Sequence, residues 1–214
     1  MSEPSKRLKI KVCGMRERDN IEALMSAPID YIGFIFYDRS PRYVSGDLAW
    51  TEGVKRTGVF VDATLAYVQE TIDRYSLTVV QLHGQESPSF CASFKRKGVE
   101  VVKSFLVDEN FDFETTNSYE GKVDYFLFDT KTKDHGGSGK TFNWDLLSKY
   151  KGDTPFFLSG GLSEQNAEAL QKISHERLYG LDINSRFELA PGVKDIPRIT
   201  RFLENIHPLN IALK

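Results

Sequence analysis

Residues 155–186 read PFFLSGGLSEQNAEALQKISHERLYGLDINSR, and this stretch sets the fold expected for the whole chain. Two largely apolar runs, Pro155–Ser159 and Tyr179–Ile183, predict buried strands, because both faces of a parallel strand are covered in α/β proteins. Between them, Ser163–Ile173 begins with a serine, a common helix start, and carries apolar residues at helical spacing. A strand, a helix and a second strand in this order predict a parallel α/β unit.

The same alternation continues toward both ends of the chain. Six further strands are predicted at Leu8–Val12, Tyr31–Phe36, Thr57–Val61, Thr78–Leu82, Glu100–Phe105 and Tyr125–Asp129. The other predicted helices are Arg18–Ser26, Leu65–Tyr75, Ser87–Lys97 and Ile196–Ile206, with a polar, irregular segment at Asp108–Glu120. Eight strands without a composition break favour one closed (β/α)8 TIM barrel over residues 1–214 rather than an open, doubly wound sheet.

The composition is that of an ordinary globular protein. With 214 residues the chain can bury one sizeable core, but it is short for a barrel, so insertions must be few. A formal net charge of −2 argues against nucleic-acid binding, which needs a concentrated basic face. We expect no membrane partner, since no apolar run approaches roughly 18 residues. Residues 1–12 lack a secretory signal, and two separate cysteines predict reduced thiols, so we expect a cytoplasmic protein.

Cys13 lies at the end of the first predicted strand, where TIM barrels place reactive groups. A free thiol has a pKa of about 8.5, so a base near neutrality needs a lowered pKa or a suitable partner. Lys11 is two residues earlier on the same strand face and could supply positive charge. The structural alternatives are a small buried side chain at Cys13 and a core lysine paired with a carboxylate at Lys11.

Asp129 directly follows the apolar run of the sixth strand, which marks it as a candidate acid or as the partner of a nearby lysine. The glycine-rich segment over residues 130–143 resembles a phosphate-binding P-loop only superficially. In the P-loop spacing the first glycine would fall at Asp134. We expect this segment to be a mobile lid over the barrel mouth instead.

Two turns predict a phosphate site. Gly160 and Gly161 follow the seventh strand, and Asn184 and Ser185 follow the eighth. Glycines let the backbone approach a ligand closely, and amides in these turns, with a short helix N-terminus, can hold a phosphate dianion. Each turn alone is weak evidence for a phosphate site, but the two together, after the last two strands, indicate one strongly.

Two further polar residues follow strands. Arg42 could pair with a carboxylate in bidentate fashion, or it could be a surface arginine. His83 ends the fourth strand and could contact the substrate, or it could be a hydrogen-bonded strand-end histidine.

These segments resemble, in order, those of the phosphoribosylanthranilate isomerases. The matching segments are Lys11–Gly14, Gly33–Phe36, Ser40–Tyr43, Gly58–Val61, Val80–Gly84, Phe128–Lys131, Gly136–Phe142, Leu158–Leu162, Asp182–Ser185 and Pro191–Asp195. They cover nearly the whole chain, and the resemblance implies a (β/α)8 barrel of tryptophan biosynthesis. One departure is Arg186, where the family often has a glycine, so the backbone of that turn is expected to be less free.

The resemblance also implies the reaction. This is an Amadori rearrangement of N-(5-phosphoribosyl)anthranilate to 1-(2-carboxyphenylamino)-1-deoxyribulose 5-phosphate, with no metal and no cofactor. By resemblance Cys13 is the general base, Asp129 is the general acid and Arg42 holds the anthranilate carboxylate. The loops after the last two strands hold the phosphate. We expect a phosphorylated small molecule as substrate and a monomeric chain, with a homodimer as the alternative.

Other functions stay open at this point. A metal-dependent pentose-phosphate epimerase needs several histidine and acidic ligands at strand ends, but of four histidines only His83 lies at one. An indole-glycerol-phosphate synthase is the other enzyme alternative, and it would need catalytic lysines and glutamates in addition to the candidate residues identified above. A barrel that binds phosphate without catalysis is disfavoured by the presence of Cys13 and Asp129.

Overall fold

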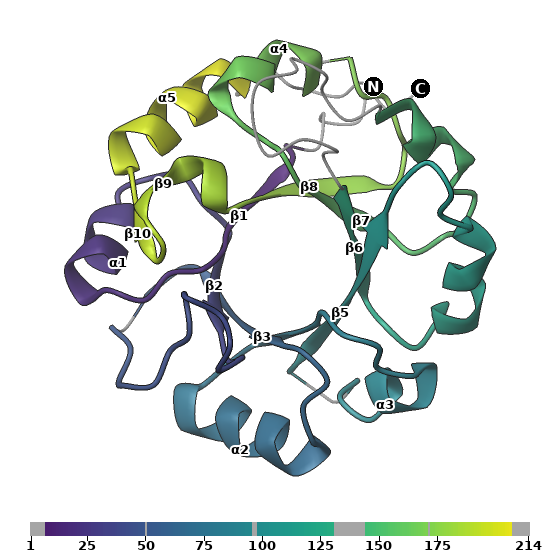
Figure 1. Cartoon of the computed structure of the whole chain (residues 1–214), viewed down its shortest axis with the longest axis horizontal. Coiled ribbons are helices and arrows are strands. Elements are labelled where there is room, and N and C mark those ends of the chain that lie inside the picture. Colours follow the sequence, from purple (N-terminus) through teal and green to yellow (C-terminus); the bar gives the residue numbers. More distant parts are fainter. Residues whose placement is uncertain (1–6, 50, 96–97, 131–143, 171, 207–214) are drawn as a thin grey trace, which may run out of the picture.

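The structure is a computed structural model that describes residues 7–49, 51–95, 98–130, 144–170 and 172–206. Eight parallel strands follow one another in chain order, and the first pairs with the eighth to close a barrel, with helices outside it (Figure 1). The strands are β1 (Lys9–Val12), β2 (Tyr31–Ile35), β3 (Lys55–Phe60), β4 (Val79–Leu82), β5 (Glu100–Val107), β6 (Tyr125–Thr130), β7 (Phe156–Ser159) and β8 (Leu178–Ile183). The predicted TIM barrel is confirmed.

The outer layer is less regular than the sequence predicts. The α-helices are α1 (Arg18–Leu24), α2 (Leu65–Tyr75), α3 (Pro88–Ala92), α4 (Ala167–Leu170) and α5 (Ile196–Ile206). The 3-10 helices are η1 (Phe113–Tyr119), η2 (Trp144–Lys149), η3 (Glu164–Asn166) and η4 (Ser185–Phe187). Helices α2 and α5 have the predicted bounds, whereas η2 was not predicted. Helix α3 ends early because i→i+3 hydrogen bonds from Ser93, Phe94 and Lys95 tighten the chain after Ala92.

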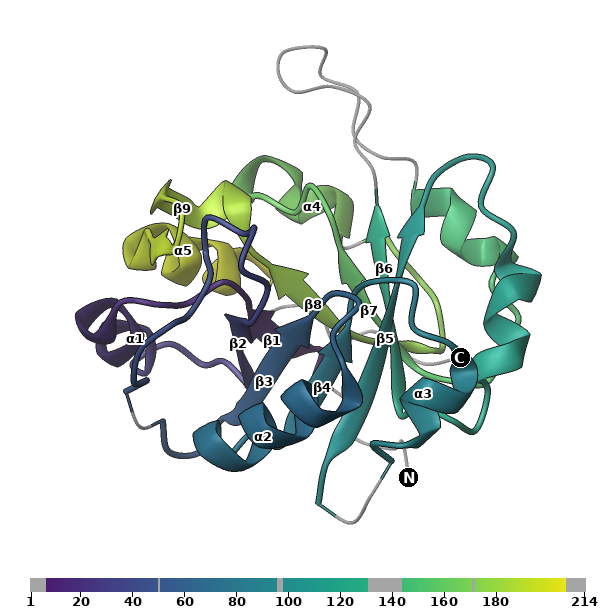
Figure 2. The same cartoon turned by 60° about the horizontal axis from the view of Figure 1, so that its bottom comes forward.

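A short hairpin of β9 (Glu188–Ala190) and β10 (Val193–Lys194) was also not predicted. It lies toward the carboxyl ends of the barrel strands, because Lys194 contacts Asn184 directly after β8 (Figure 2). Among the described residues, no helix is both long and apolar enough to cross a membrane.

Buried apolar side chains form one cluster on each face of the barrel wall. The larger cluster packs the strands against the helices, with Phe126 and Phe128 of β6 as examples. The smaller cluster fills the barrel interior near the amino ends of the strands and consists of Tyr31, Val79, Val102, Leu127 and Phe157. We call this smaller cluster the interior plug. It leaves the other end of the barrel to polar side chains.

Buried polar side chains also lie on the barrel strands next to the plug residues, since Thr57 is in register with Val79 and Gln81 with Val102. Thr57, Gln81 and Ser104 come from the adjacent strands β3, β4 and β5. Lys11 of β1 is in register with Asp182 of β8, and Lys11 Nζ lies 2.9 Å from Asp182 Oδ1. Because both partners are almost fully buried, each depends on the other for its charge.

Helix α2 begins at a capping threonine. The Thr64 hydroxyl oxygen accepts a hydrogen bond from the Tyr67 N–H at 3.2 Å. We expect Thr64→Ala to lower the free energy of unfolding by about 1 kcal/mol. In a chain of this size, that corresponds to a fall in Tm of about 2–4 °C by calorimetry. Thr64→Ser keeps the acceptor and is the control, and an equal loss in both variants would contradict the capping role.

Candidate active site

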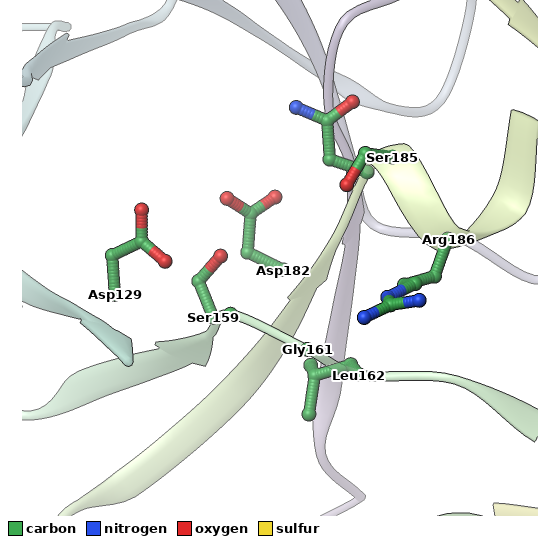
Figure 3. Close-up of a pocket in the computed structure, with 9 residues that line it drawn as sticks. Asp129, Ser159, Gly161, Leu162, Asp182, Ser185 and Arg186 are labelled. Carbon is green, nitrogen blue, oxygen red and sulfur yellow. The ribbon is translucent and has the colours of Figure 1, made fainter. Parts of the chain in front are cut away.

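A cavity of about 130 Å³ opens at the carboxyl ends of β6, β7 and β8 (Figure 3). It is lined by Asp129, Ser159, Gly160, Gly161, Leu162, Asp182, Asn184, Ser185 and Arg186. Pockets that enclose a whole drug-sized ligand measure about 300–1000 Å³, so this cavity fits one end of a longer molecule. The candidate acid Asp129 and the two turns predicted to bind phosphate therefore line the same cavity.

The turn after β7 depends on its glycines. Gly160 and Gly161 have φ of 87° and 67°, a left-handed conformation that glycine adopts without steric cost. Asn166 fixes this turn, because its side chain accepts from the Ser163 N–H and donates to the Gly161 carbonyl, both at 2.8 Å. A turn fixed in this way lets a ligand approach the backbone closely, as the predicted phosphate site requires.

The turn after β8 continues directly into η4, which starts at Ser185. Arg186 lies in η4 and lines the cavity beside Gly161 (Figure 3). Among the described residues, the non-glycine positions with positive φ are Asp62 and Ser76. The backbone at Arg186 therefore accommodates a side chain without left-handed strain, and its guanidinium adds positive charge to the wall.

Asp129 lies near the carboxyl end of β6, in register with Ser159 of β7. Its carboxylate points into the cavity, as does that of Asp182 (Figure 3). His83 follows β4, and its Nε2 lies 3.6 Å from Asp129 Oδ2, while Gln81 Nε2 lies 3.0 Å from His83 Nδ1. Both candidate roles of His83 agree with this position, since it is hydrogen-bonded and also faces the candidate acid.

Cys13 lies at the mouth of the barrel beside β2. Its N–H donates to the Ile183 carbonyl at 2.9 Å, which extends the pairing of β1 with β8 by one residue. A Cβ placed on Gly33 of β2 would lie 2.8 Å from the sulfur, so the thiol packs against the inward face of that strand. It does not point into the helical layer.

The electrostatic surroundings of Cys13 differ in part from the sequence expectation. Burial raises the pKa of the thiol, whereas Lys11 and then Lys194 act in the opposite direction. The pKa of the thiol is therefore raised rather than lowered, but the cationic partner that the sequence analysis required is present. Burial alone would lower the pKa of Lys11, yet Asp182 and Cys13 outweigh it and raise the pKa. The structural alternative for Lys11, a core lysine paired with a carboxylate, is thus correct, and Lys11 also faces the thiol.

Arg42 is held in the loop after β2, where Tyr43 bridges to Ile35 and the Arg42 N–H donates to the Ser40 hydroxyl at 3.1 Å. It does pair with a carboxylate in bidentate fashion, but that carboxylate is Glu188. Arg42 Nε lies 2.8 Å from Glu188 Oε1 and Nη2 lies 2.6 Å from Oε2. Nη1 is the guanidinium nitrogen that this ion pair leaves to other partners.

Glu188 and Lys194 belong to the site but were not predicted. Lys194 Nζ lies 2.6 Å from Glu188 Oε1. Burial would raise the pKa of Glu188, but hydrogen bonds from Arg42 and Lys194 prevail and lower it to about 2. Lys194 lies within the matching segment Pro191–Asp195, which was the available signal. Glu188 lies outside every such segment. Of the predicted lid at 130–143, Thr130 is the last residue of β6, and residues 131–143 lie outside the described residues.

The family model described as N-(5'-phosphoribosyl)anthranilate (PRA) isomerase matches residues 10–205. The chain belongs to this family. An N-(5'-phosphoribosyl)anthranilate isomerase of Parabacteroides distasonis is 46% identical over 207 residues, which cover 93% of this chain and 94% of the relative. One of Phocaeicola vulgatus is 43% identical over 198 residues, covering 92% and 97%.

Solved structures of the PRA isomerase family share the fold. The phosphoribosyl anthranilate isomerase of Thermotoga maritima has a TM-score of 0.79 at 29% identity, covering 94% of this chain and all of that one. A family structure in complex with reduced 1-(o-carboxyphenylamino)-1-deoxyribulose 5-phosphate also has a TM-score of 0.79, at 26% identity with the same coverage. Membership of the PRA isomerases removes the epimerase and synthase alternatives.

Proposed function

We propose that Cys13 and Asp129 are the base and the acid with which this chain isomerises N-(5'-phosphoribosyl)anthranilate, a step of tryptophan biosynthesis. One observation carries these roles. Both residues lie at the carboxyl ends of barrel strands, Cys13 after β1 and Asp129 in β6, and the buried ion pair of Lys11 with Asp182 lies beside them. An acid and a base at separate strand ends can act on two different atoms of one sugar, here the ring oxygen and C2', which are both bonded to C1'.

The reaction needs a proton donor first. Asp129 protonates the ring oxygen of the furanose, the ring opens, and the anthranilate nitrogen takes up the positive charge as an iminium ion. The iminium acidifies the C2' hydrogen, which the Cys13 thiolate removes to give an enolamine. Tautomerisation of the enolamine yields the ketose. The substrate's own nitrogen is the electron sink, so this scheme requires neither a metal nor an organic cofactor.

Two anchors fix the reacting carbons between these groups. The phosphate occupies the cavity formed by Gly160, Gly161, Asn184 and Ser185, where backbone turns and the start of η4 favour an anion. At the other anchor, Arg42 holds the anthranilate carboxylate through the guanidinium edge that Glu188 does not use. Holding a substrate at both ends converts binding energy into alignment of the reacting atoms.

Arg42→Ala tests the carboxylate anchor. We expect KM to rise roughly 10- to 100-fold, because a hydrogen bond to a charged group contributes about 1.5–3 kcal/mol, while kcat falls less. Arg39→Ala removes an exposed arginine from the same loop and is the control, with unchanged kinetics. A normal KM in Arg42→Ala would show that the carboxylate is bound elsewhere.

We further infer a single catalytic domain that acts as a monomer in the cytoplasm. Both cysteines, Cys13 and Cys91, are free and buried, which suits a reducing compartment. The large apolar side chains that are exposed in the described ranges are Leu65, Tyr67, Leu106 and Leu189, spread over α2, β5 and β9. Such scattered residues give little apolar area for a stable dimer. Light scattering should give one species of 24.3 kDa, and twice that mass would establish the homodimer instead.

A further inference from the structure

Lys194 is a buried cation that the proposed chemistry does not use. Its side chain is 0% exposed, and its Nζ lies 2.6 Å from Glu188 Oε1 and 2.7 Å from Asn184 Oδ1. Its backbone is held by Asn20 of α1, which accepts from the Lys194 N–H at 2.7 Å and donates to its carbonyl at 2.9 Å. Ordering a lysine side chain costs conformational entropy, which the contacts at its Nζ and at its backbone must offset. These contacts therefore hold the ammonium in one position relative to the site.

Three side chains of this region converge on Gly14, the residue after Cys13. A Cβ placed on Gly14 would lie 2.7 Å from Arg42 Cδ, 2.8 Å from Asn184 Oδ1 and 3.4 Å from Lys194 Nζ. Gly14 also has a φ of 77°, which favours glycine. The Lys194 ammonium therefore reaches the loop that carries the thiol and lies between the two substrate anchors.

The charges in this region do not cancel. Arg42, Glu188 and Lys194 form a cluster in which one carboxylate is shared by two cations, so one positive charge remains in excess. We call it the Arg42–Glu188–Lys194 cluster. A dianionic phosphate at Asn184, a carboxylate at Arg42 and a thiolate at Cys13 would each be stabilised by that excess charge.

The groups that face the Cys13 thiol are Lys11 of β1, Asp182 of β8, Lys194 of β10 and Arg42 of the loop after β2. Lys11 and Asp182 balance one another at 2.9 Å. The uncompensated positive charge near the thiol therefore comes from the Arg42–Glu188–Lys194 cluster. An opposite charge at close range favours the ionised form of a buried acid.

We propose that Lys194 is a positioning residue: through Glu188 it fixes the carboxylate anchor, and its charge favours the Cys13 thiolate. The inference rests on the proposed function, because it requires Cys13 to be the base. It adds a role for the β9–β10 hairpin, which places the ammonium near Gly14, the residue after Cys13, although the hairpin and the thiol are far apart in the sequence.

The pH profile of kcat/KM tests this role. Activity of a thiolate base rises with pH as the thiol ionises, so loss of a nearby positive charge must move this acidic limb upward. In Lys194→Met we expect the limb to move to higher pH by about 1 pH unit or more. That shift lowers kcat/KM at neutral pH about tenfold or more. Lys9→Met is the matched control, since it removes a lysine paired with Asp30 at the amino end of β1 and should leave the limb in place.

A double variant separates charge from packing. Lys194→Met combined with Glu188→Gln again leaves one excess positive charge, on Arg42. We expect its acidic limb to return toward the wild-type pH, and we expect KM to be higher than in the wild type because the Arg42 guanidinium has lost its bidentate carboxylate partner. Glu188→Gln alone has a second excess positive charge, so its limb should move to lower pH. This single variant gives the test if Lys194→Met does not fold.

Two results would overturn the proposal. One is a folded Lys194→Met enzyme with reduced activity but an unmoved acidic limb, which is the signature of packing alone. The other is a limb that fails to follow the charge through the Glu188 variants. Failure of the proposed function looks different, because Cys13→Ala would then turn over substrate normally, whatever the Lys194 variants do.

Discussion

Cys13→Ala should reduce turnover by about 10²–10⁴-fold and leave the barrel folded. The methyl group cannot remove the C2' proton, and no other thiol is at hand, since Cys91 lies on α3. The fold should persist because the sulfur packs against Gly33 at the polar end of the barrel rather than in the apolar core. The measurement is kcat with freshly made substrate, alongside far-ultraviolet circular dichroism.

The control for Cys13→Ala is Cys91→Ala, which removes the other buried thiol and should keep normal turnover. This pair distinguishes chemistry from a general effect of losing a cysteine. Near-normal kcat in Cys13→Ala would remove the base from the scheme and leave the chain's family membership unaffected.

Asp129→Asn should cost a similar factor, about 10²–10⁴ in kcat, for a different reason. The amide has nearly the shape of the acid but cannot deliver a proton to the ring oxygen, so the furanose stays closed. Because the phosphate and carboxylate anchors are untouched, we expect KM to change little. A loss seen in KM alone would mean that Asp129 binds the substrate rather than protonating it.

Asp108→Asn provides a comparison for Asp129→Asn. Asp108 directly follows β5, the neighbouring strand, and its Oδ1 accepts from the Asn110 N–H at 2.9 Å. It does not line the cavity, so its amide variant should turn over normally. Equal losses in the two variants would point to a general effect of charge at this end of the barrel.

Much of the fold follows from local signals in the sequence. Helix α2 has its predicted bounds because Thr64 caps its start and Ser76 ends it in a left-handed conformation. The strands were predictable because both faces of each are buried, so their runs are apolar. The strand-end rule also placed Asp129 correctly at the cavity.

The rest depends on contacts between residues distant in sequence. The ion pair of Arg42 with Glu188 spans 146 positions, and the bonds of Asn20 to Lys194 span 174. No local periodicity encodes such pairs, and a lone glutamate after η4 is indistinguishable from a surface residue. The direction of the pKa shift of Cys13 could not be predicted from the sequence either, because it depends on the burial of the thiol and on charged groups from other elements.

The interior plug of Tyr31, Val79, Val102, Leu127 and Phe157 has a consequence for redesign. Its side chains come from the amino halves of β2, β4, β5, β6 and β7 and pack the barrel there, whereas the proposed reacting groups lie at the carboxyl ends of the strands. Residues around the mouth of the barrel can therefore be exchanged to admit a different sugar phosphate while the interior plug still stabilises the fold. The same separation lets evolution alter specificity in small steps, each starting from a molecule that is already stable.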